Sequence, residues 1–246
     1  MSILDELKDI EMKQVKQGTV RMFKDFSKCE ILQDYDLGGV IPKIVVLDGR
    51  KKKILKFAKV KEALEVRDYL TEFIACRVAK SLGYDVQEVE LGYFNGKECV
   101  AIEMFDYDIV TFTGFGQSTD SMFFHYDLDM LLTLPFDKKK FNLSQSEFER
   151  FVWHVFVLDM FISNFDRHEN NWGFQRVNGK YTPTALYDLG ASLYNRFILN
   201  GVDYNLKEIR HIIESDTRCA ILYQGKKKNY TELMILYGSN QTLLSE

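Results

Sequence analysis

The chain has 246 residues, 46% of them hydrophobic and 14% aromatic, so it can bury a sizeable core in one large domain or in two lobes. With only 3 prolines and 15 glycines it is neither collagen-like nor of low complexity. The 32 basic and 36 acidic residues leave a formal net charge of −4, so no nucleic-acid partner is expected.

Strand-like patterns dominate the first half of the chain. Apolar and β-branched residues separated by turn residues predict strands over 19–26, 29–32, 44–47, 54–58, 86–93 and 99–105. Asp48-Gly49 and Asn95-Gly96 each lie between two of these segments. Both pairs predict tight hairpins, because Asp, Asn and Gly adopt positive φ at low cost.

After residue 60, helical spacing predicts three helices. The first covers residues 61–82, with Gly83 at the position of a C-terminal cap. The second begins after Ser144, since Glu147 three residues later completes a capping box. A short third helix is expected over 206–213. Because the pattern changes near residue 107, we expect an α+β protein with a strand-rich lobe over 1–106 and a mainly helical lobe over 107–246.

Nothing in the sequence predicts a membrane span or an export signal. The longest apolar run, 151–162, is interrupted by His154 and Asp159 and is too short to cross a bilayer. The 4 cysteines are scattered without metal-site spacing, which favours free thiols. We therefore expect a cytoplasmic protein without membrane association, and the sequence leaves export as an effector open.

Chemistry-bearing residues concentrate after the second helix. Asp166 is followed five residues later by Asn171, and Asp188-Leu189-Gly190 comes 22 residues after Asp166. Phosphoryl transfer uses a carboxylate to accept the proton of the attacking hydroxyl, and oxygen ligands to hold Mg²⁺ against the phosphates. We therefore expect Asp166 to be the catalytic base, with Asn171 and Asp188 as metal ligands. Their convergence is expected to require a hairpin between residues 180–182 and 185–187.

Parts of a nucleotide site are also predicted upstream. Gly38-Gly39 lies between strand-like segments, where backbone N–H groups could approach phosphates. Lys56 lies on a predicted strand, and Glu72 lies on the first predicted helix. A lysine on a strand paired with a glutamate on a helix is a required element of protein kinases. Residues 102–106 end the last strand, where a hinge would offer backbone groups to adenine.

The order Asp166-Arg167-His168-x-x-Asn171, followed by Tyr187-Asp188-x-Gly190, resembles the HipA-like bacterial serine/threonine kinases, and within them the smaller secreted proinflammatory type. The resemblance implies a two-lobed protein-kinase-like fold that uses ATP and Mg²⁺. It also implies a protein substrate and allows an antitoxin partner. Residues 36–43 contain no Ser or Thr, so the self-phosphorylation of this loop known in the family is not expected.

The resemblance implies a role for each matching residue. The backbones of Glu103 and Phe105 would contact adenine, Tyr187 would border it, and Lys56 would bind the phosphates. His168 would line the phosphate and metal site together with Asn171.

Two other functions stay open. One keeps the fold and changes the acceptor to a lipid or small-molecule hydroxyl, although no long basic amphipathic stretch for an anionic membrane is present. The other is a catalytically inactive nucleotide-binding module, which predicts a missing metal ligand or phosphate lysine. Neither is visibly missing from the sequence.

Overall fold

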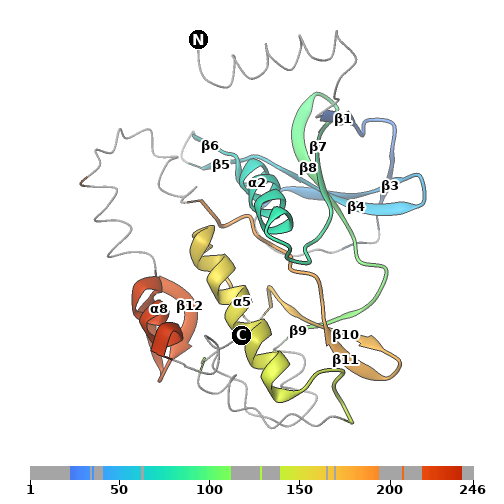
Figure 1. The fold of residues 1–246 in the computed structure, drawn as a ribbon. Helices are drawn as coiled ribbons and strands as arrows, with labels where there is room; N and C mark the ends of the chain where they lie inside the picture. The colour runs from blue at the N-terminus through green and yellow to red at the C-terminus, as the bar shows by residue number, and fades with distance from the viewer. Residues whose placement is uncertain are drawn as a thin grey trace.

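A computed structural model gives the fold of the chain (Figure 1). It describes residues 23–33, 35, 41–61, 64–111, 128, 139–164, 166–168, 170–193, 207 and 218–239. The predicted glycine loop at Gly38 and Gly39 lies outside the described residues. Of the helix expected over 206–213, only Lys207 is described, and it is helical.

A six-stranded sheet forms the larger part of the first lobe, in the order β1-β7-β8-β4-β3-β2. Its strands are β1 (Phe23–Asp25), β2 (Glu30–Leu32), β3 (Lys43–Asp48), β4 (Lys51–Phe57), β7 (Val89–Phe94) and β8 (Lys97–Glu103). Neighbouring strands are antiparallel except β1 and β7, which are parallel.

Both predicted hairpins are confirmed. In the first, Asp48 belongs to β3 and pairs with Lys51, so the turn consists of Gly49 and Arg50 and not of the expected Asp48 and Gly49, and only Gly49 has a positive φ, of +65°. The turn between β7 and β8 consists of Asn95 and Gly96, with φ values of 51° and 77°. The two positive φ angles of this second turn match the twist of the flanking strands.

Helix α2 (Asp68–Ser81) packs against β7 and β8 of this sheet. Its predicted start at residue 61 is wrong, because β5 (Lys59–Lys61) and β6 (Leu64–Val66) form an antiparallel pair there. Its predicted end is confirmed. Gly83 N donates to Lys80 O and Tyr84 N to Ala79 O, each at 3.1 Å, and Gly83 has a φ of +88°. These are the two bonds of a Schellman motif.

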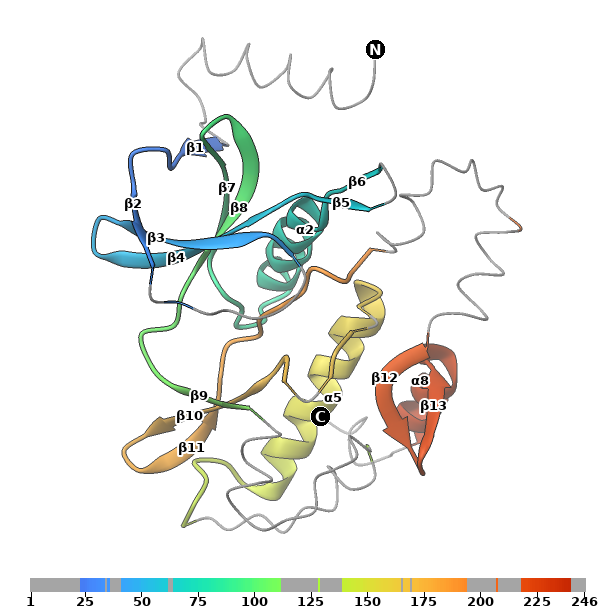
Figure 2. The same cartoon turned by 180° about the vertical axis from the view of Figure 1, so that it is seen from behind.

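The second lobe is built around helix α5 (Gln145–Phe161). The predicted capping box is confirmed, since Ser144 accepts from Glu147 N and the Glu147 side chain accepts from Ser144 N. The remaining elements are β9 (Ile109–Thr111), β10 (Gly173–Val177), β11 (Lys180–Pro183), β12 (Arg218–Tyr223), β13 (Lys226–Asn229) and α8 (Tyr230–Ser239). Strands β11-β10-β9 form a three-stranded sheet, and β12 pairs with β13 beside α8 (Figure 2).

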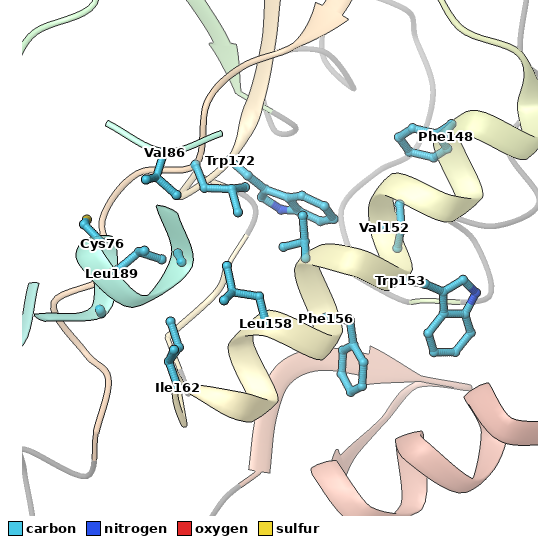
Figure 3. Packing of buried hydrophobic residues seen from close by; sticks show 14 of the residues in the cluster. Cys76, Val86, Phe148, Val152, Trp153, Phe156, Leu158, Ile162, Trp172 and Leu189 are labelled. Carbon is cyan, nitrogen blue, oxygen red and sulfur yellow. The ribbon is translucent and has the colours of Figure 1, made fainter. Parts of the chain in front are cut away.

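Helix α2 contributes to the cores of both lobes. Tyr69, near its start, packs with Leu91 and Val100 of the large sheet. Farther along, Cys76 belongs to the large cluster that contains Val152, Leu158 and other residues of α5 (Figure 3). A helix shared in this way holds its side chains in a fixed relation to both lobes, because close-packed interiors resist small shifts.

Residues 104–108 connect β8 of the large sheet with β9 of the small sheet. The predicted boundary between residues 106 and 107 falls in this connection and stays a prediction. Among the described residues, no helix is long and apolar enough to cross a membrane.

Candidate active site

A cavity of about 1220 Å³ is lined by residues of both lobes. It is large enough for a nucleotide, since ligand pockets commonly measure about 300–1,000 Å³. Five predicted site residues line it: Lys56, Glu103, Phe105, Tyr187 and Asp188. Glu72 lies behind Lys56 and is not part of the lining.

Lys56 lies at the centre of a charged cluster at one end of this cavity. Its Nζ is 2.9 Å from Oε1 and 2.8 Å from Oε2 of Glu72, and 3.0 Å from Oδ1 of Asp188. Lys56 and Glu72 are 9% and 1% exposed. The strand β4, the helix α2 and the segment after β11 therefore meet at one ammonium group. We call Lys56, Glu72 and Asp188 the Lys56 cluster.

The electrostatics of the Lys56 cluster keep its lysine and Asp188 ionised. Burial alone would lower the pKa of Lys56, but Glu72 and Asp188 outweigh burial and raise it. Burial alone would raise the pKa of Asp188, but Lys56, followed by Arg167 and Lys43, outweighs burial and lowers it. Asp188 also has a φ of +56°, a left-handed conformation uncommon outside glycine and typical of constrained sites.

Lys43 brings a second positive charge into the cavity. It is directly opposite Lys56 in the pairing of β3 with β4, and both line the cavity. Burial, followed by the charge of Lys56, lowers the pKa of Lys43. Two like charges side by side on a sheet repel each other, so this pair is expected where an anion is to be bound.

Residues 102–109, which run from the end of β8 through the connection between the lobes to the start of β9, also line the cavity. Glu103 N donates to Glu88 O and Met104 N to Lys52 O, each at 2.9 Å, so this segment continues the ladder of the sheet. The rings of Phe105 and Tyr187 meet edge to face with centroids 6.0 Å apart. These contacts bring Tyr187 beside the segment within the cavity lining.

Residues 164–171 form a compact loop stabilised by its own hydrogen bonds, with Phe165 and Glu169 outside the described residues. Asn171 Nδ2 donates to Asp166 O at 2.9 Å, and His168 N donates to the same carbonyl at 2.9 Å. His168 Nδ1 accepts from Asn170 N at 3.2 Å, so the proton of the neutral ring is on Nε2. The described residues that line the cavity do not include Asp166, His168 or Asn171.

Arg167 anchors this loop to helix α5. Arg167 and Asp159 of α5 are both fully buried and form a bidentate ion pair, with Nε 2.9 Å from Oδ2 and Nη2 3.0 Å from Oδ1. The third nitrogen, Nη1, donates to Asn171 O and, at 3.0 Å, to Tyr187 O. One guanidinium group therefore joins the loop to the residue that precedes Asp188.

The hairpin expected between 180–182 and 185–187 is wrong. Strand β11 pairs with β10, from Phe174 with Pro183 to Val177 with Lys180. Leu186 instead forms a parallel bridge with Val86, with Leu186 N 2.8 Å from Asp85 O and Gln87 N 2.9 Å from Leu186 O. The turn residues Asn178 and Gly179, both at positive φ, favour the shorter hairpin.

Gly190 contacts the Lys56 cluster directly. A Cβ atom at this position would lie 3.2 Å from Oε2 of Glu72, tighter than ordinary van der Waals contact. Its backbone is not at positive φ, so any residue could adopt its conformation. The glycine in Asp188-Leu189-Gly190 is therefore explained by close approach to Glu72 and not by backbone freedom.

The donor set around Asn171 and Asp188 suits a hard cation. Because Nδ2 of Asn171 donates to a carbonyl, the orientation of the amide is fixed and Oδ1 remains as its acceptor. One amide oxygen and one carboxylate match the few oxygen ligands that Mg²⁺ takes from proteins. Among the described residues no group of three or more His, Cys, Asp or Glu could hold a metal ion.

The structure thus brings the predicted residues together in two sets joined by Arg167. Sequence reasoning missed Lys43 and Gln87, which also line the cavity. The sequence signal for Lys43 was incomplete, because a turn of Asp48 and Gly49 would place Lys43 opposite Ile54, and only the observed turn of Gly49 and Arg50 places it opposite Lys56. Gln87 had no such signal, because its contacts with Leu186 and Glu103 join segments that are distant in the chain.

The chain is similar in sequence and in fold to known proteins. A serine/threonine-protein kinase, CtkA of Helicobacter pylori, is 30% identical over 69% of this chain and 56% of its own length. The crystal structure of the H. pylori proinflammatory kinase CtkA matches with a TM-score of 0.71 and 26% identity, covering 85% of this chain and 76% of that one. The chain therefore spans little more than half of the curated kinase it resembles.

A more distant solved structure shows the same fold. A chain of the Shewanella oneidensis toxin–antitoxin complex of HipA, HipB and operator DNA matches with a TM-score of 0.55 and 17% identity, over 85% of this chain and 54% of that one. The predicted α+β kinase-like fold is confirmed by these similarities. The family model described as the HipA-like C-terminal domain matches residues 35–234, and the chain therefore belongs to this family.

Proposed function

We propose that the chain is an ATP- and Mg²⁺-dependent kinase that transfers the γ-phosphoryl group to a serine or threonine hydroxyl of a protein. The observation that carries the proposal is the Lys56 cluster at one end of a nucleotide-sized cavity. The similarity to CtkA, which is named a serine/threonine-protein kinase, supports the same reaction.

In this proposal, Lys56 and Lys43 bind the phosphates at the charged end of the cavity. Glu72 holds the Lys56 ammonium in place, so the lysine loses little conformational freedom when the nucleotide arrives. The glycine loop at Gly38 and Gly39 is proposed to cover the phosphates. At the other end, the backbones of Glu103 and Phe105 contact adenine, and Tyr187 borders it.

Asp166 is proposed to orient the acceptor hydroxyl and take its proton. The hydroxyl oxygen forms a bond to the γ-phosphorus while the bond to the β–γ bridging oxygen breaks, and ADP leaves. Arg167 and Asn171 keep the backbone of Asp166 in position for this transfer. His168 is proposed to lie beside the transferring group, with Nε2–H as its donor.

Asn171 Oδ1 and Asp188 are the residues that would hold Mg²⁺, which neutralises charge on the phosphate oxygens when it is bound. The lowered pKa of Asp188 keeps this carboxylate ionised in weak acid, where it must remain a ligand. The proposed lobes, 1–106 and 107–246, meet at the cavity.

The acceptor is proposed to be a protein. A lipid or small-molecule acceptor remains the alternative, and an inactive module is disfavoured because Lys56, Asp166, Asn171 and Asp188 are all present. An antitoxin partner is proposed only by analogy with the HipA–HipB complex. The free thiols of Cys29, Cys76 and Cys99 agree with a cytoplasmic location, which also stays a proposal.

The test is transfer of labelled γ-phosphate from ATP to generic protein substrates and, separately, to lipid vesicles. Asp166→Asn and Asp188→Asn keep the size of each side chain and should reduce transfer at least about a hundredfold. Asp25→Asn, on the exposed β1 strand, is the matched control and should retain full activity. Full phosphate transfer by Asp166→Asn or Asp188→Asn would refute the assignment of these residues. Labelled phosphate in lipid and not in protein would instead support a lipid kinase.

A further inference from the structure

Gln87 lines the cavity, and its side-chain amide contacts Glu103 of β8. Its Nε2 donates to the carbonyl of Glu103 at 3.1 Å, and its backbone N–H donates to Leu186 O at 2.9 Å. Val86, Gln87 and Glu88 all line the cavity. Hydrogen bonds therefore hold both the backbone and the side-chain amide of Gln87.

The contact with Glu103 also determines which way the amide faces. A carbonyl oxygen can only accept, so the atom next to it must be Nε2, and Oε1 is left as the acceptor of the amide. Ile102, Phe105 and Tyr187 line the same cavity as Gln87. An oriented acceptor among apolar and aromatic side chains is suited to reading one edge of a planar base.

The register of the sheet separates Glu103, the residue that Gln87 contacts, from Lys56. Glu103 pairs with Lys53 of β4, three residues before Lys56. Three residues of an extended strand span about 10 Å. A nucleotide with its phosphates at Lys56 and Lys43 therefore places its base near Glu103 and Gln87.

We propose that Gln87 is a base-specificity residue, whose Oε1 accepts a hydrogen bond from the 6-amino group of adenine. The inference rests on the proposed nucleotide-binding function and extends it to the choice of base. A 6-oxo purine such as guanine would bring an oxygen acceptor against Oε1, and two acceptors without a donor between them disfavour binding. The cavity should therefore select adenine nucleotides over guanine nucleotides.

The experiment is a thermodynamic cycle between the side chain and the 6-amino group. Affinities of the full chain for ATP and for purine riboside triphosphate, which lacks this group, are measured by calorimetry in excess Mg²⁺, for the wild type and Gln87→Leu. Loss of one hydrogen bond should reduce the preference for ATP by about three- to tenfold in the variant. Gln145→Leu, on the first turn of α5, is the control and should keep the wild-type preference.

A second variant tests the polarity of the contact. Gln87→Lys replaces the acceptor by a donor, so the ratio of GTP to ATP affinity should rise about three- to tenfold above that of the wild type. An unchanged preference for ATP over purine riboside triphosphate in Gln87→Leu, or an unchanged ratio in Gln87→Lys, would overturn the role of Gln87 while nucleotide binding itself persists. Absence of ATP binding by the wild-type chain would instead overturn the proposed function and this inference with it.

Discussion

Lys56 and Arg167 are the two buried cations of the candidate site, and they are neutralised in different ways. Lys56 is bound by Glu72 and Asp188, and it lines the cavity. Arg167 is bound by Asp159 and by backbone carbonyls, and it is fully buried behind the loop. The charge of Lys56 is thus available to a ligand, whereas the charge of Arg167 is used entirely within the protein.

This difference separates residues that act on a ligand from residues that position others. A phosphate can compete with Asp188 for Lys56, because the Asp188 side chain is 45% exposed and its contact can be exchanged. Nothing comparable can reach Arg167, so its planar group serves as a fixed support for Asn171 and Tyr187. Substitutions at Lys56 and at Arg167 should consequently differ in how their effects on activity and on stability are related.

The largest effect is expected for Lys56→Met. Activity should fall at least about a hundredfold, and unfolding free energy should fall by about 3 kcal/mol, because Glu72 remains as a buried charge without its partner. Adding Glu72→Leu should recover most of the stability and none of the activity. Chemical denaturation and phosphotransfer assays together check this, and recovered activity in the double variant would show that Lys56 only balances Glu72.

Arg167→Lys should be nearly as costly for stability. A lysine keeps the charge but cannot make the bidentate contact with Asp159 and also reach the carbonyls of Asn171 and Tyr187. We expect a loss of about 2 kcal/mol and a fall in kcat with little change in the KM for ATP. A variant that loses stability but keeps the wild-type kcat would show that Arg167 does not position the loop.

A smaller and more local effect is expected for Gly190→Ala. An added Cβ atom would lie 3.2 Å from Oε2 of Glu72, so this carboxylate would have to shift by a few tenths of an ångström while it stays paired with Lys56. We expect kcat/KM to fall about tenfold, a barrier change of about 1.4 kcal/mol, while the melting temperature changes little. Gly238→Ala in α8 is the matched control, since its Cβ meets nothing within 4 Å. Equal activity of the two variants would remove the steric explanation of Gly190.

The smallest effect concerns pH and Lys43. Phosphate binds the protonated lysine, and the pKa of Lys43 is lowered by burial and then by Lys56. As the pH rises, Lys43 therefore loses its proton before an ordinary lysine does. The affinity for ATP should consequently fall a few-fold while the pH rises towards about 10. In Lys43→Arg this decline should disappear, because arginine stays charged. Measuring ATP affinity between pH 7 and pH 10 tests this difference. An identical decline in both proteins would show that a group other than Lys43 causes it.

Much of the architecture could be predicted from local sequence. The turns at Gly49 and at Asn95-Gly96, the cap at Gly83 and the capping box of Ser144 each depend on a few adjacent residues, and all four agree with the structure. The start of α2 was predicted too early. Residues 59–66 alternate charged and apolar side chains in a way that fits both a strand pair and a helix, and the pairing of β5 with β6 decides between them.

The sequence by itself determined the kinds of residue in the candidate site and their order, because motif spacing and turn chemistry are local properties. Only the tertiary structure decided which of them meet. The pairing of β11 with β10, the bridge between Val86 and Leu186, and the close approach of Gly190 to Glu72 all join segments distant in the chain. Such contacts depend on the packing of whole elements against each other, which no short stretch of sequence encodes.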